Sequence, residues 1–409
     1  MKKKEVVIIN STGGSPYHGP NFRSYYTGKN LLLLGYKVTI IANSYFHKFY
    51  NTPLLKGTLT NEVIDRINYI WIKTKKYQTR GFFQVLNQIQ FTLKLYKNFH
   101  KMGLKDATVF IVSSPVPFSI IPVIFYAKIW NIKVIFEIRD LWPLVLQELG
   151  NFSKWHPYMY LLKKTEKFAY LNSDHLVSVK PGDFEYIGQK YNVSKDKFSY
   201  IPNGFDFSIK PIKVLPLEMR ESIPKNKFIV GYTGSLSIAY GIIYLLKAAR
   251  ELKNEGIHFI IIGSGPEKQD LINFVEKNKL LNVSFLGHLE LSIVTKLIEY
   301  FDVCFLGYRK AGWLQYGISS NKLFGYMHSA KPIIAAMDTK YDLITKGKCG
   351  FTVPSEDPYK IQTAIKKMYK LPKNKRDELG ENGKRYLLKH HSFEQIAEKY
   401  SRLFDALSK

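Results

Sequence analysis

The sequence predicts an α/β protein of two consecutive, doubly wound domains that face each other across a cleft. Short apolar runs alternate with helical segments along the whole chain, which is typical of parallel strands covered by helices on both faces. The same pattern restarts near residue 204, and 409 residues exceed what one hydrophobic core usually supports. Because ligands of such sheets bind outside the carboxyl ends of the strands, we expect the functional residues directly after them.

In the first half, the strand pattern EVVIIN leads into a turn, a helical stretch at residues 23–34 and a stop at Gly35. The apolar stretch at residues 107–130 is long enough to span a membrane, but Pro115 and Pro117 would break a helix near its middle. We therefore expect a buried strand, a turn and a helix there. The predicted strands of this half are residues 5–10, 37–42, 108–112, 133–137 and 175–179.

The second half follows a turn cluster, and residues 205–225 are predicted to be a linker because their apolar periodicity is poor. The predicted domains are therefore residues 1–203 and 204–388. Residues 389–409 contain a strongly periodic helix at 393–407, which we expect to pack back on the N-terminal domain. The predicted strands of this half are residues 228–232, 258–262, 283–286, 303–306 and 332–335.

The chain is strongly basic, with 60 Lys and Arg residues against 33 Asp and Glu residues and a formal net charge of +27. Such a charge attracts nucleic acid, anionic lipid or a phosphorylated substrate. Nucleic acid is the least favoured of these, since the sequence contains no recognisable module for binding it. The two cysteines, Cys304 and Cys349, exclude a disulfide scaffold and a Cys-rich zinc site, and they suit a reducing compartment.

Part of the basic charge gathers in residues 66–105, which contain nine basic residues and no acidic one. Apolar or aromatic residues recur there at helical spacing and predict one helix face: Phe82, Leu86, Ile89, Leu93, Tyr96 and Phe99. Lys94, Lys97 and Lys101 lie off that face. Such a basic and aromatic surface attracts an anionic partner, which could be an anionic membrane surface, nucleic acid or a phosphorylated substrate. The alternative is that the face packs against the sheet of its own domain.

Several junctions between a strand and a turn, or between a turn and a helix, are candidate ligand loops. Glycine lets a backbone approach a ligand closely, and the free N–H groups at a helix start bind anions. At residues 319–322, hydroxyl groups, a helix start and one ammonium group coincide, which suits a diphosphate. Plain turns and simple helix capping are the alternatives. The candidate residues are Gly13, Gly14, Ser235, Gly263, Gly265, Ser319, Ser320 and Lys322.

The segment EIRDLWP, residues 137–143, places three charged residues at the end of a buried strand, where ionised groups need partners or a function. Arg139 can bind a phosphate or carboxylate, and Asp140 can hold a sugar hydroxyl or take a proton. We predict both as catalytic residues; the alternative is a structural pair between an Arg and an Asp or Glu. No metal-binding His spacing, P-loop or nucleophile motif is present, which favours group transfer without a metal ion.

In their order along the chain, these segments resemble the motifs of glycosyltransferase family 4, whose members are retaining, nucleotide-sugar-dependent enzymes with two Rossmann-like domains, the GT-B fold. The segments at 113–118 and 137–143 resemble the branch that adds amino sugars during bacterial O-antigen or capsule assembly. The matching segments are Gly13-Gly14 with residues 19–23, then residues 113–118, 137–143, 201–206, 233–236, 263–266, 286–288 and 321–332.

The resemblance implies a UDP-sugar donor in the C-terminal domain, with the base against the backbone of His288 and Leu289. Arg139 and Asp140 occupy the place where many members carry a His-Asp pair at the reacting sugar. The diphosphate would lie near Ser235, Gly263, Gly265, Ser319, Ser320 and Lys322.

Two departures from the family pattern stand out. Ser235 and Tyr240 replace an Arg and a Lys of the phosphate loop, so Lys322 or Arg139 must supply more of the positive charge. Gly317 and Gly325 replace two glutamates, the second of which normally binds the donor ribose.

We therefore expect a retaining glycosyltransferase that moves a sugar, by the resemblance an N-acetylated amino sugar, from UDP to a lipid-linked glycan in lipopolysaccharide, O-antigen or capsule synthesis. Such an enzyme would be cytoplasmic and peripheral to the inner face of the plasma membrane. It would need no metal or other cofactor and would not bind nucleic acid. The alternatives are a sugar-nucleotide epimerase on the same fold and a non-catalytic transferase homologue.

Overall fold

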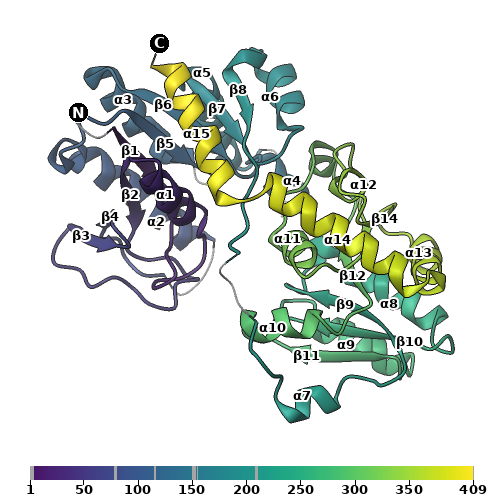
Figure 1. The fold of residues 1–409 in the computed structure, drawn as a ribbon. Coiled ribbons are helices and arrows are strands. Elements are labelled where there is room, and N and C mark those ends of the chain that lie inside the picture. The colour runs from purple at the N-terminus through teal and green to yellow at the C-terminus, as the bar shows by residue number, and fades with distance from the viewer. Residues whose placement is uncertain are drawn as a thin grey trace. The chain divides into compact units, whose positions relative to one another are not determined.

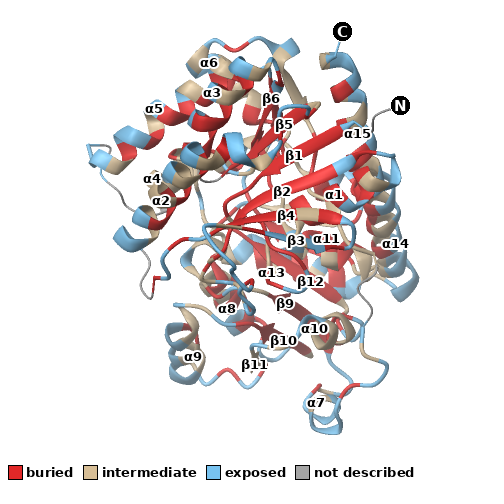
Figure 2. Cartoon of the chain, turned by 90° about the vertical axis from the view of Figure 1, so that its left-hand side faces the viewer, coloured by how far each residue is buried: buried red, intermediate tan, exposed pale blue. Residues whose placement is uncertain are grey.

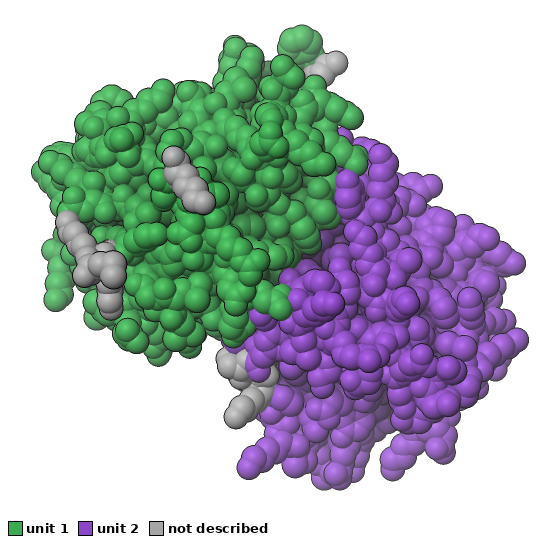
Figure 3. Space-filling model, turned by 45° about the horizontal axis from the view of Figure 1, so that its top comes forward, with its two compact units in different colours: residues 1–204, 393–409 green, residues 205–392 purple. Residues whose placement is uncertain are grey.

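The computed structural model describes residues 4–77, 81–114, 117–149, 153, 155–207 and 211–408. The chain divides into two compact units (Figure 3), one of residues 1–204 with 393–409 and one of residues 205–392. The prediction treated residues 389–409 as one C-terminal segment, but the structure divides this segment between the two units. Residues 389 and 390 end a helix of the second unit, and the first unit resumes at Phe393.

The first unit is built on one sheet, whose strands in the described residues are β1 (Glu5–Ile9), β2 (Lys37–Asn43), β3 (Leu59–Ile64), β4 (Ile67–Ile72), β5 (Val109–Ser113), β6 (Lys133–Ile138), β7 (His175–Ser178) and β8 (Phe198–Tyr200). Their order is β3-β4-β2-β1-β5-β6-β7-β8 (Figure 1). All neighbours are parallel except β3, which runs antiparallel to β4 at one edge. The central strands are apolar and buried (Figure 2).

Helices cover both faces of this sheet. The helices of the unit are α1 (Arg23–Leu33), α2 (Phe82–Asn98), α3 (Ile120–Trp130), α4 (Leu144–Leu149), α5 (Pro157–Asn172), α6 (Asp183–Tyr191) and α15 (Phe393–Leu407), with short 3-10 turns η1 (Phe99–Met102), η2 (Pro117–Ser119) and η3 (Lys195–Lys197). On one face α1 and α15 pack together, and Tyr400 and Phe404 of α15 are buried against the strands. Figure 2 shows α2, α3 and α5 on the other face.

The second unit contains a parallel sheet in the order β11-β10-β9-β12-β13-β14. Its strands are β9 (Phe228–Thr233), β10 (Ile257–Ile262), β11 (Val283–Gly287), β12 (Val303–Gly307), β13 (Ile333–Ala336) and β14 (Gly350–Val353). Its helices are α7 (Leu217–Glu221), α8 (Ile242–Glu251), α9 (Lys268–Lys277), α10 (Leu291–Ile298), α11 (Asn321–His328), α12 (Leu343–Lys346), α13 (Pro358–Lys370) and α14 (Lys373–His390), with η4 (Ile238–Tyr240) and η5 (Gly312–Tyr316). The cores formed with α8 and α13, and with α10 and α11, lie on the two sides of this sheet.

The predicted fold class, two doubly wound α/β domains, is confirmed, and all ten predicted strands lie within one residue of their expected bounds. The prediction missed β3, β4, β8 and β14. Three of them, β3, β8 and β14, lie at sheet edges, whereas β4 is an apolar strand between β3 and β2. The predicted linker at 205–225 is wrong in part, since it contains α7, and Leu215 and Ile223 are buried in the core of the second unit. Residues 208–210 lie outside the described residues.

Residues 107–130 form β5, η2 and α3, as expected, with Pro115 outside the described part of the chain. None of the described helices is both long and apolar enough to cross a membrane.

Candidate functional site

In the second unit, the strand order reverses beside β9, because the chain continues to β10 on one side and to β12 on the other. Ligands of doubly wound sheets bind at the carboxyl ends of the strands next to such a reversal. The turns after β9 and β10 meet there, and a side chain from the first turn of α11 reaches them.

Glycines allow these turns to come into direct backbone contact. Gly234 has a φ of 135°, and a Cβ there would lie 2.0 Å from Cε of Lys322. Gly263 has a φ of 142°, and its Cβ would lie 1.8 Å from the carbonyl oxygen of Gly234. A Cβ on Gly265 would lie 2.1 Å from the carbonyl oxygen of Leu236. Any side chain would clash at these positions, so the glycines bring the two turns and Lys322 together.

The ammonium group of Lys322 lies among aromatic side chains. It donates a hydrogen bond to the Tyr232 hydroxyl (3.0 Å), and its Nζ lies 2.9 Å from the centroid of the Tyr240 ring. Burial lowers the pKa of Lys322 to about 7, and no acidic side chain of the described residues pairs with it. A cation at a helix start also faces the positive end of the helix dipole. A bound anion would relieve both costs.

The start of α11 offers further hydrogen-bonding groups. Ser320 is the N-cap residue, but its side chain makes no capping hydrogen bond, so the simple capping alternative does not hold for it. Ser319 Oγ is buried and has no hydrogen-bond partner among the described residues. Ser235 has an exposed side chain, and its carbonyl oxygen accepts a hydrogen bond from the Tyr232 hydroxyl (2.7 Å). These groups lie on the elements that carry Lys322 and its partners.

His288 and Leu289 directly follow β11, the edge strand next to β10. The Gly263 amide donates to the carbonyl oxygen of Gly287 (2.6 Å), so this strand end adjoins the turn after β10. His288 is exposed, whereas Leu289 is half-buried against the core. Both residues are therefore next to the turn that carries two of the predicted glycines.

In the first unit, Gly13 and Gly14 lie buried in the loop after β1. A Cβ on Gly14 would lie 2.1 Å from the carbonyl oxygen of Gly19, so the loop can close on itself only with glycine there. The Tyr69 hydroxyl also donates to the Gly14 carbonyl oxygen (3.1 Å). The loop is thus fixed at the carboxyl end of β1.

The charged residues at the end of β6 have different partners in the structure. Glu137 is buried, with its Oε1 2.8 Å from Nε of Arg23, and the hydroxyls of Ser113 and Tyr400 donate to it. Burial alone would raise the pKa of Glu137, but the charge of Arg23 and these hydrogen bonds lower it to about 2. Glu137 therefore makes the structural ion pair, with Arg23 rather than with its neighbour in sequence.

Arg139 and Asp140 lie beyond the end of β6. The Arg139 amide donates to Ser114 Oγ (2.8 Å), and its guanidinium group has no hydrogen-bond or ion-pair partner among the described residues. Asp140 is exposed, and Nζ of the buried Lys180 lies 3.8 Å from its Oδ1. Because Ile138 of β6 pairs with Ser178 of β7, Asp140 and Lys180 occupy matching positions after neighbouring strands.

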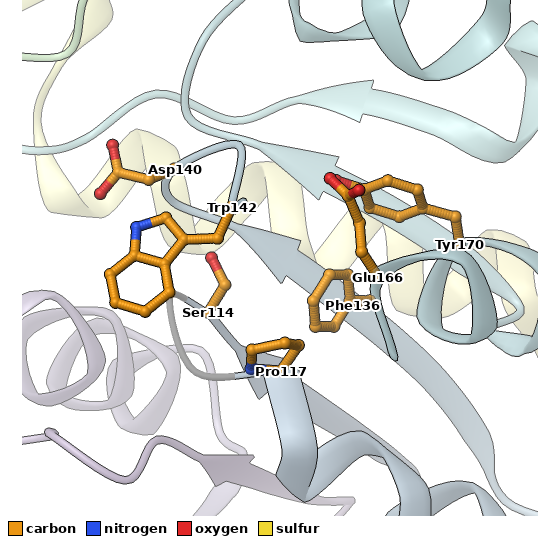
Figure 4. Close-up of a pocket in the computed structure, with 7 residues that line it drawn as sticks. All are labelled: Ser114, Pro117, Phe136, Asp140, Trp142, Glu166 and Tyr170. Carbon is orange, nitrogen blue, oxygen red and sulfur yellow. The ribbon is translucent and has the colours of Figure 1, made fainter. Parts of the chain in front are cut away.

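A small pocket opens beside Asp140 (Figure 4), and its lining residues are Ser114, Pro117, Phe136, Asp140, Trp142, Glu166 and Tyr170. Burial raises the pKa of Glu166 to about 7, although hydroxyls of Tyr191 and Tyr170 donate to it and Lys190 lies nearby. The pocket thus combines aromatic surface with two carboxyl groups, of which Glu166 is buried and Asp140 is exposed.

Sequence reasoning missed Lys180, Glu166 and Tyr170. Lys180 could have been found from its place after a predicted strand, equivalent to that of Asp140. Glu166 and Tyr170 lie four residues apart on the buried face of α5, where an acidic residue needs partners. Within the described residues, no group of three or more His, Cys, Asp or Glu side chains could hold a metal ion.

Two family models match the chain in succession. The model described as Glycosyltransferase Family 4 matches residues 19–208, and the model described as Glycosyl transferases group 1 matches residues 217–386. A probable glycosyltransferase of Pseudomonas aeruginosa, WbjE, is 22% identical over 304 residues, which cover 72% of each chain.

Solved structures share the fold over nearly the whole length. Sucrose-phosphate synthase from Thermosynechococcus elongatus aligns with a TM-score of 0.73 and 17% identity, covering 99% of both chains. HepE of Anabaena, in complex with UDP and glucose, aligns with a TM-score of 0.68 and 13% identity, covering 98% of this chain and 99% of its own.

Proposed function

The chain belongs to glycosyltransferase family 4, with the GT-B fold, and on that premise we propose that it moves an N-acetylated amino sugar from a UDP-sugar to a lipid-linked glycan in bacterial surface polysaccharide synthesis. The observation that carries the proposal is Lys322, a buried amine without an acidic partner among the described residues, at a helix start beside two glycine turns. These features suit a diphosphate. The UDP-bound HepE structure shares the fold and supports UDP as the nucleotide.

In this proposal, Lys322 and the first-turn amides of α11 stabilise the negative charge that develops on the departing UDP, without a metal ion. The backbone at His288 and Leu289 holds the uracil, and the turns at Ser235, Gly263 and Gly265 approach the diphosphate. Arg139 and Asp140 act on the transferred sugar or its acceptor. Retention of the anomeric configuration is expected from the family.

A lipid-linked acceptor requires contact with a membrane, and the surface of α2 supports this part of the proposal. Asn87, Gln88, Phe91 and Leu95 form the buried face of α2. Most of the predicted apolar face points instead to solvent: Phe82, Leu86, Leu93 and Tyr96 are exposed, Ile89 is half-buried and Phe99 is buried. The alternative, in which that face packs against the sheet, therefore holds only for Phe99.

Helix α3 extends this exposed apolar surface, because the Tyr96 ring contacts the Phe125 ring, with 5.5 Å between the ring centroids. The surface, which we call the α2–α3 surface, consists of Phe82, Leu86, Leu93, Tyr96, Ile121, Phe125 and Ile129. Lys97 and Lys101 are exposed beside it, whereas Lys94 is held by a hydrogen bond to the Lys73 carbonyl oxygen (2.6 Å). Apolar area flanked by lysines suits peripheral binding to the anionic inner leaflet, which implies a cytoplasmic enzyme.

Calorimetric titration with UDP, UDP-N-acetylglucosamine, GDP and ADP tests the donor assignment. We expect UDP and its sugar to bind and the purine nucleotides to bind far more weakly; binding of GDP or ADP in place of UDP would overturn the assignment. Release of UDP that depends on a prenyl-diphosphate-linked acceptor would then support transfer. Conversion of the UDP-sugar without acceptor would indicate an epimerase, and binding without turnover a non-catalytic homologue.

A further inference from the structure

We propose that Tyr240 is a positioning residue of the donor site: the face of its ring holds the ammonium group of Lys322 in front of the diphosphate. The inference rests on the proposed function, since it assigns a role within the same site. At the position of Tyr240, the family resemblance places a lysine. In this chain, the aromatic ring at that position would instead orient Lys322, which comes from another element.

The contacts of Lys322 leave its ammonium group between two tyrosines. The side chain leaves the first turn of α11 and passes over Gly234, which has no Cβ to obstruct it. The Tyr232 hydroxyl accepts one hydrogen bond from Nζ, and the Tyr240 ring faces Nζ at 2.9 Å. An ammonium group has three N–H donors. One donor can therefore still reach a phosphate oxygen while the other contacts persist.

Tyr240 itself is held firmly. It ends η4, where its amide donates to the Ser237 carbonyl oxygen (3.0 Å), and Gly241 follows with a φ of 56°. Its ring packs against that of Tyr308 at 5.5 Å. A Cβ on Gly307 would lie 2.6 Å from the Tyr240 carbonyl oxygen, so the backbone approaches β12 closely. The ring is thus a fixed surface on which a flexible lysine can settle.

The energetic reason for the ring is that none of the described acidic side chains pairs with Lys322. The ionisable groups around the Tyr232 end of the site are Tyr240, Tyr308, Tyr326 and Glu267, and no acidic side chain of the described residues pairs with Lys322. A carboxylate there would hold the lysine but would also repel a diphosphate. The electron-rich ring face attracts the ammonium group without adding a negative charge. Tyr240 can therefore orient Lys322 and leave its charge available to the donor.

A double-mutant cycle separates positioning from general stability. UDP is titrated into the wild type, Tyr240→Phe, Tyr240→Leu, Lys322→Met and the Tyr240→Leu/Lys322→Met double variant. We expect Tyr240→Phe, which keeps the ring, to bind within twofold of the wild type. We expect Tyr240→Leu to bind roughly 3- to 30-fold more weakly, and to add nothing once Lys322 is Met. An equal loss in both backgrounds would overturn the proposal.

The dependence of the UDP dissociation constant on pH gives a second readout. In the wild type and Tyr240→Phe we expect affinity to fall as the pH rises above 7, because the lysine loses its proton; Lys322→Met should show no such fall. A fall of the same size in Lys322→Met would contradict the role of Lys322 and with it that of Tyr240.

A measurement without nucleotide distinguishes failure of this inference from failure of the proposed function. In protein with isotope-labelled lysine, the signal lost in Lys322→Met identifies this residue. A ring above Nζ should shift the neighbouring CH₂ signal upfield in the wild type and Tyr240→Phe but not in Tyr240→Leu. If the wild type shows the upfield shift but binds no UDP, the assignment of UDP as the donor nucleotide is wrong. The double-mutant cycle is then repeated with inorganic pyrophosphate in place of UDP, and its result tests the role of Tyr240. An unshifted signal in the wild type overturns the inference.

Discussion

Nε of Arg23 lies 2.8 Å from Oε1 of Glu137, and both side chains are about 95% buried although 113 residues separate them in the chain. The same guanidinium group donates to the carbonyl oxygens of Ile201 and Pro202, and Tyr400 donates to Glu137. This ion pair and its hydrogen bonds thus connect α1, β6, α15 and the last residues before the second unit. Glu137, the first charged residue of the segment 137–143, therefore has a structural role rather than a catalytic one.

We predict that Glu137→Gln lowers the free energy of unfolding of the first unit by about 3–5 kcal/mol, because it leaves the guanidinium group of Arg23 buried without its counter-charge. Urea unfolding followed by tryptophan fluorescence measures this, since four of the five tryptophans lie in the first unit. Glu290→Gln, at an exposed position of the second unit, is the control. An unchanged unfolding midpoint for Glu137→Gln would contradict the structural role.

The same pair predicts how stability responds to acid. The pKa of Glu137 is lowered to about 2 in the folded protein, below the ordinary value of the unfolded chain. Its contribution is therefore present above pH 4.5 and is lost as the pH falls towards 2. In Glu137→Gln this part of the acid dependence should be missing, as unfolding curves between pH 2 and 5 would show.

We predict that Lys322→Ala weakens UDP binding by about 10- to 100-fold, the effect of removing a charge-assisted hydrogen bond worth roughly 1.5–3 kcal/mol. Folding should be little affected, because the amine makes no ion pair with an acid of the described chain. Calorimetry of the variant, beside Lys253→Ala as an exposed control, measures both affinities. Equal UDP affinity in folded Lys322→Ala and the wild type would sink the diphosphate assignment.

We predict that Asp140→Asn and Arg139→Ala each lower turnover by about 100-fold or more while UDP affinity stays within a few-fold, since a contact made only in the transition state affects rate alone. Lys180→Met should lower turnover less, because its ammonium group supports Asp140 from 3.8 Å. Asp106→Asn, before the amino end of β5, serves as the control. Wild-type rates in both Asp140→Asn and Arg139→Ala would return these residues to a structural role.

Gly325 gives a prediction of gained function. It lies inside α11, and a Cβ there would meet no atom within 4 Å. Gly325→Ala should therefore raise stability by about 1 kcal/mol, the usual cost of glycine in a helix. Gly325→Glu restores the acid that the family uses for the ribose, and it should tighten UDP binding by roughly two- to tenfold. Unchanged UDP affinity in Gly325→Glu, with Gly325→Ala as the reference, would contradict a ribose at this place.

The α2–α3 surface predicts binding to vesicles that contain phosphatidylglycerol. Leu93→Ser with Phe125→Ser should weaken this binding by at least tenfold, since each buried apolar side chain contributes about 1.5–3 kcal/mol. Lys97→Glu with Lys101→Glu should weaken it at low salt only. Leu281→Ser, an exposed leucine of the second unit, should have no effect in co-sedimentation. Vesicle binding that withstands both pairs of substitutions would exclude this surface.

The sequence alone was enough for ten strands of the two sheets, because buried parallel strands are short apolar runs whose bounds follow from local composition. For example, β10 and β12 begin and end within one residue of the prediction. The sequence also located the turn glycines and the start of α11, since glycine and helix-start residues are local signals. The edge strand β3 escaped, because its polar residues Thr60, Asn61 and Glu62 hide the pattern, and its pairing with β4 is not local.

Only the tertiary structure decided which charged residues are partners. Glu137, Arg139 and Asp140 lie within four residues of sequence, but the fold buries Glu137 against Arg23 and places Asp140 beside Lys180. Likewise, no local sequence pattern predicts that the Tyr240 ring faces Lys322, which lies 82 residues further along the chain. Ion pairs and ring contacts depend on which elements pack together, and that arrangement follows from burying the whole core rather than from any single segment.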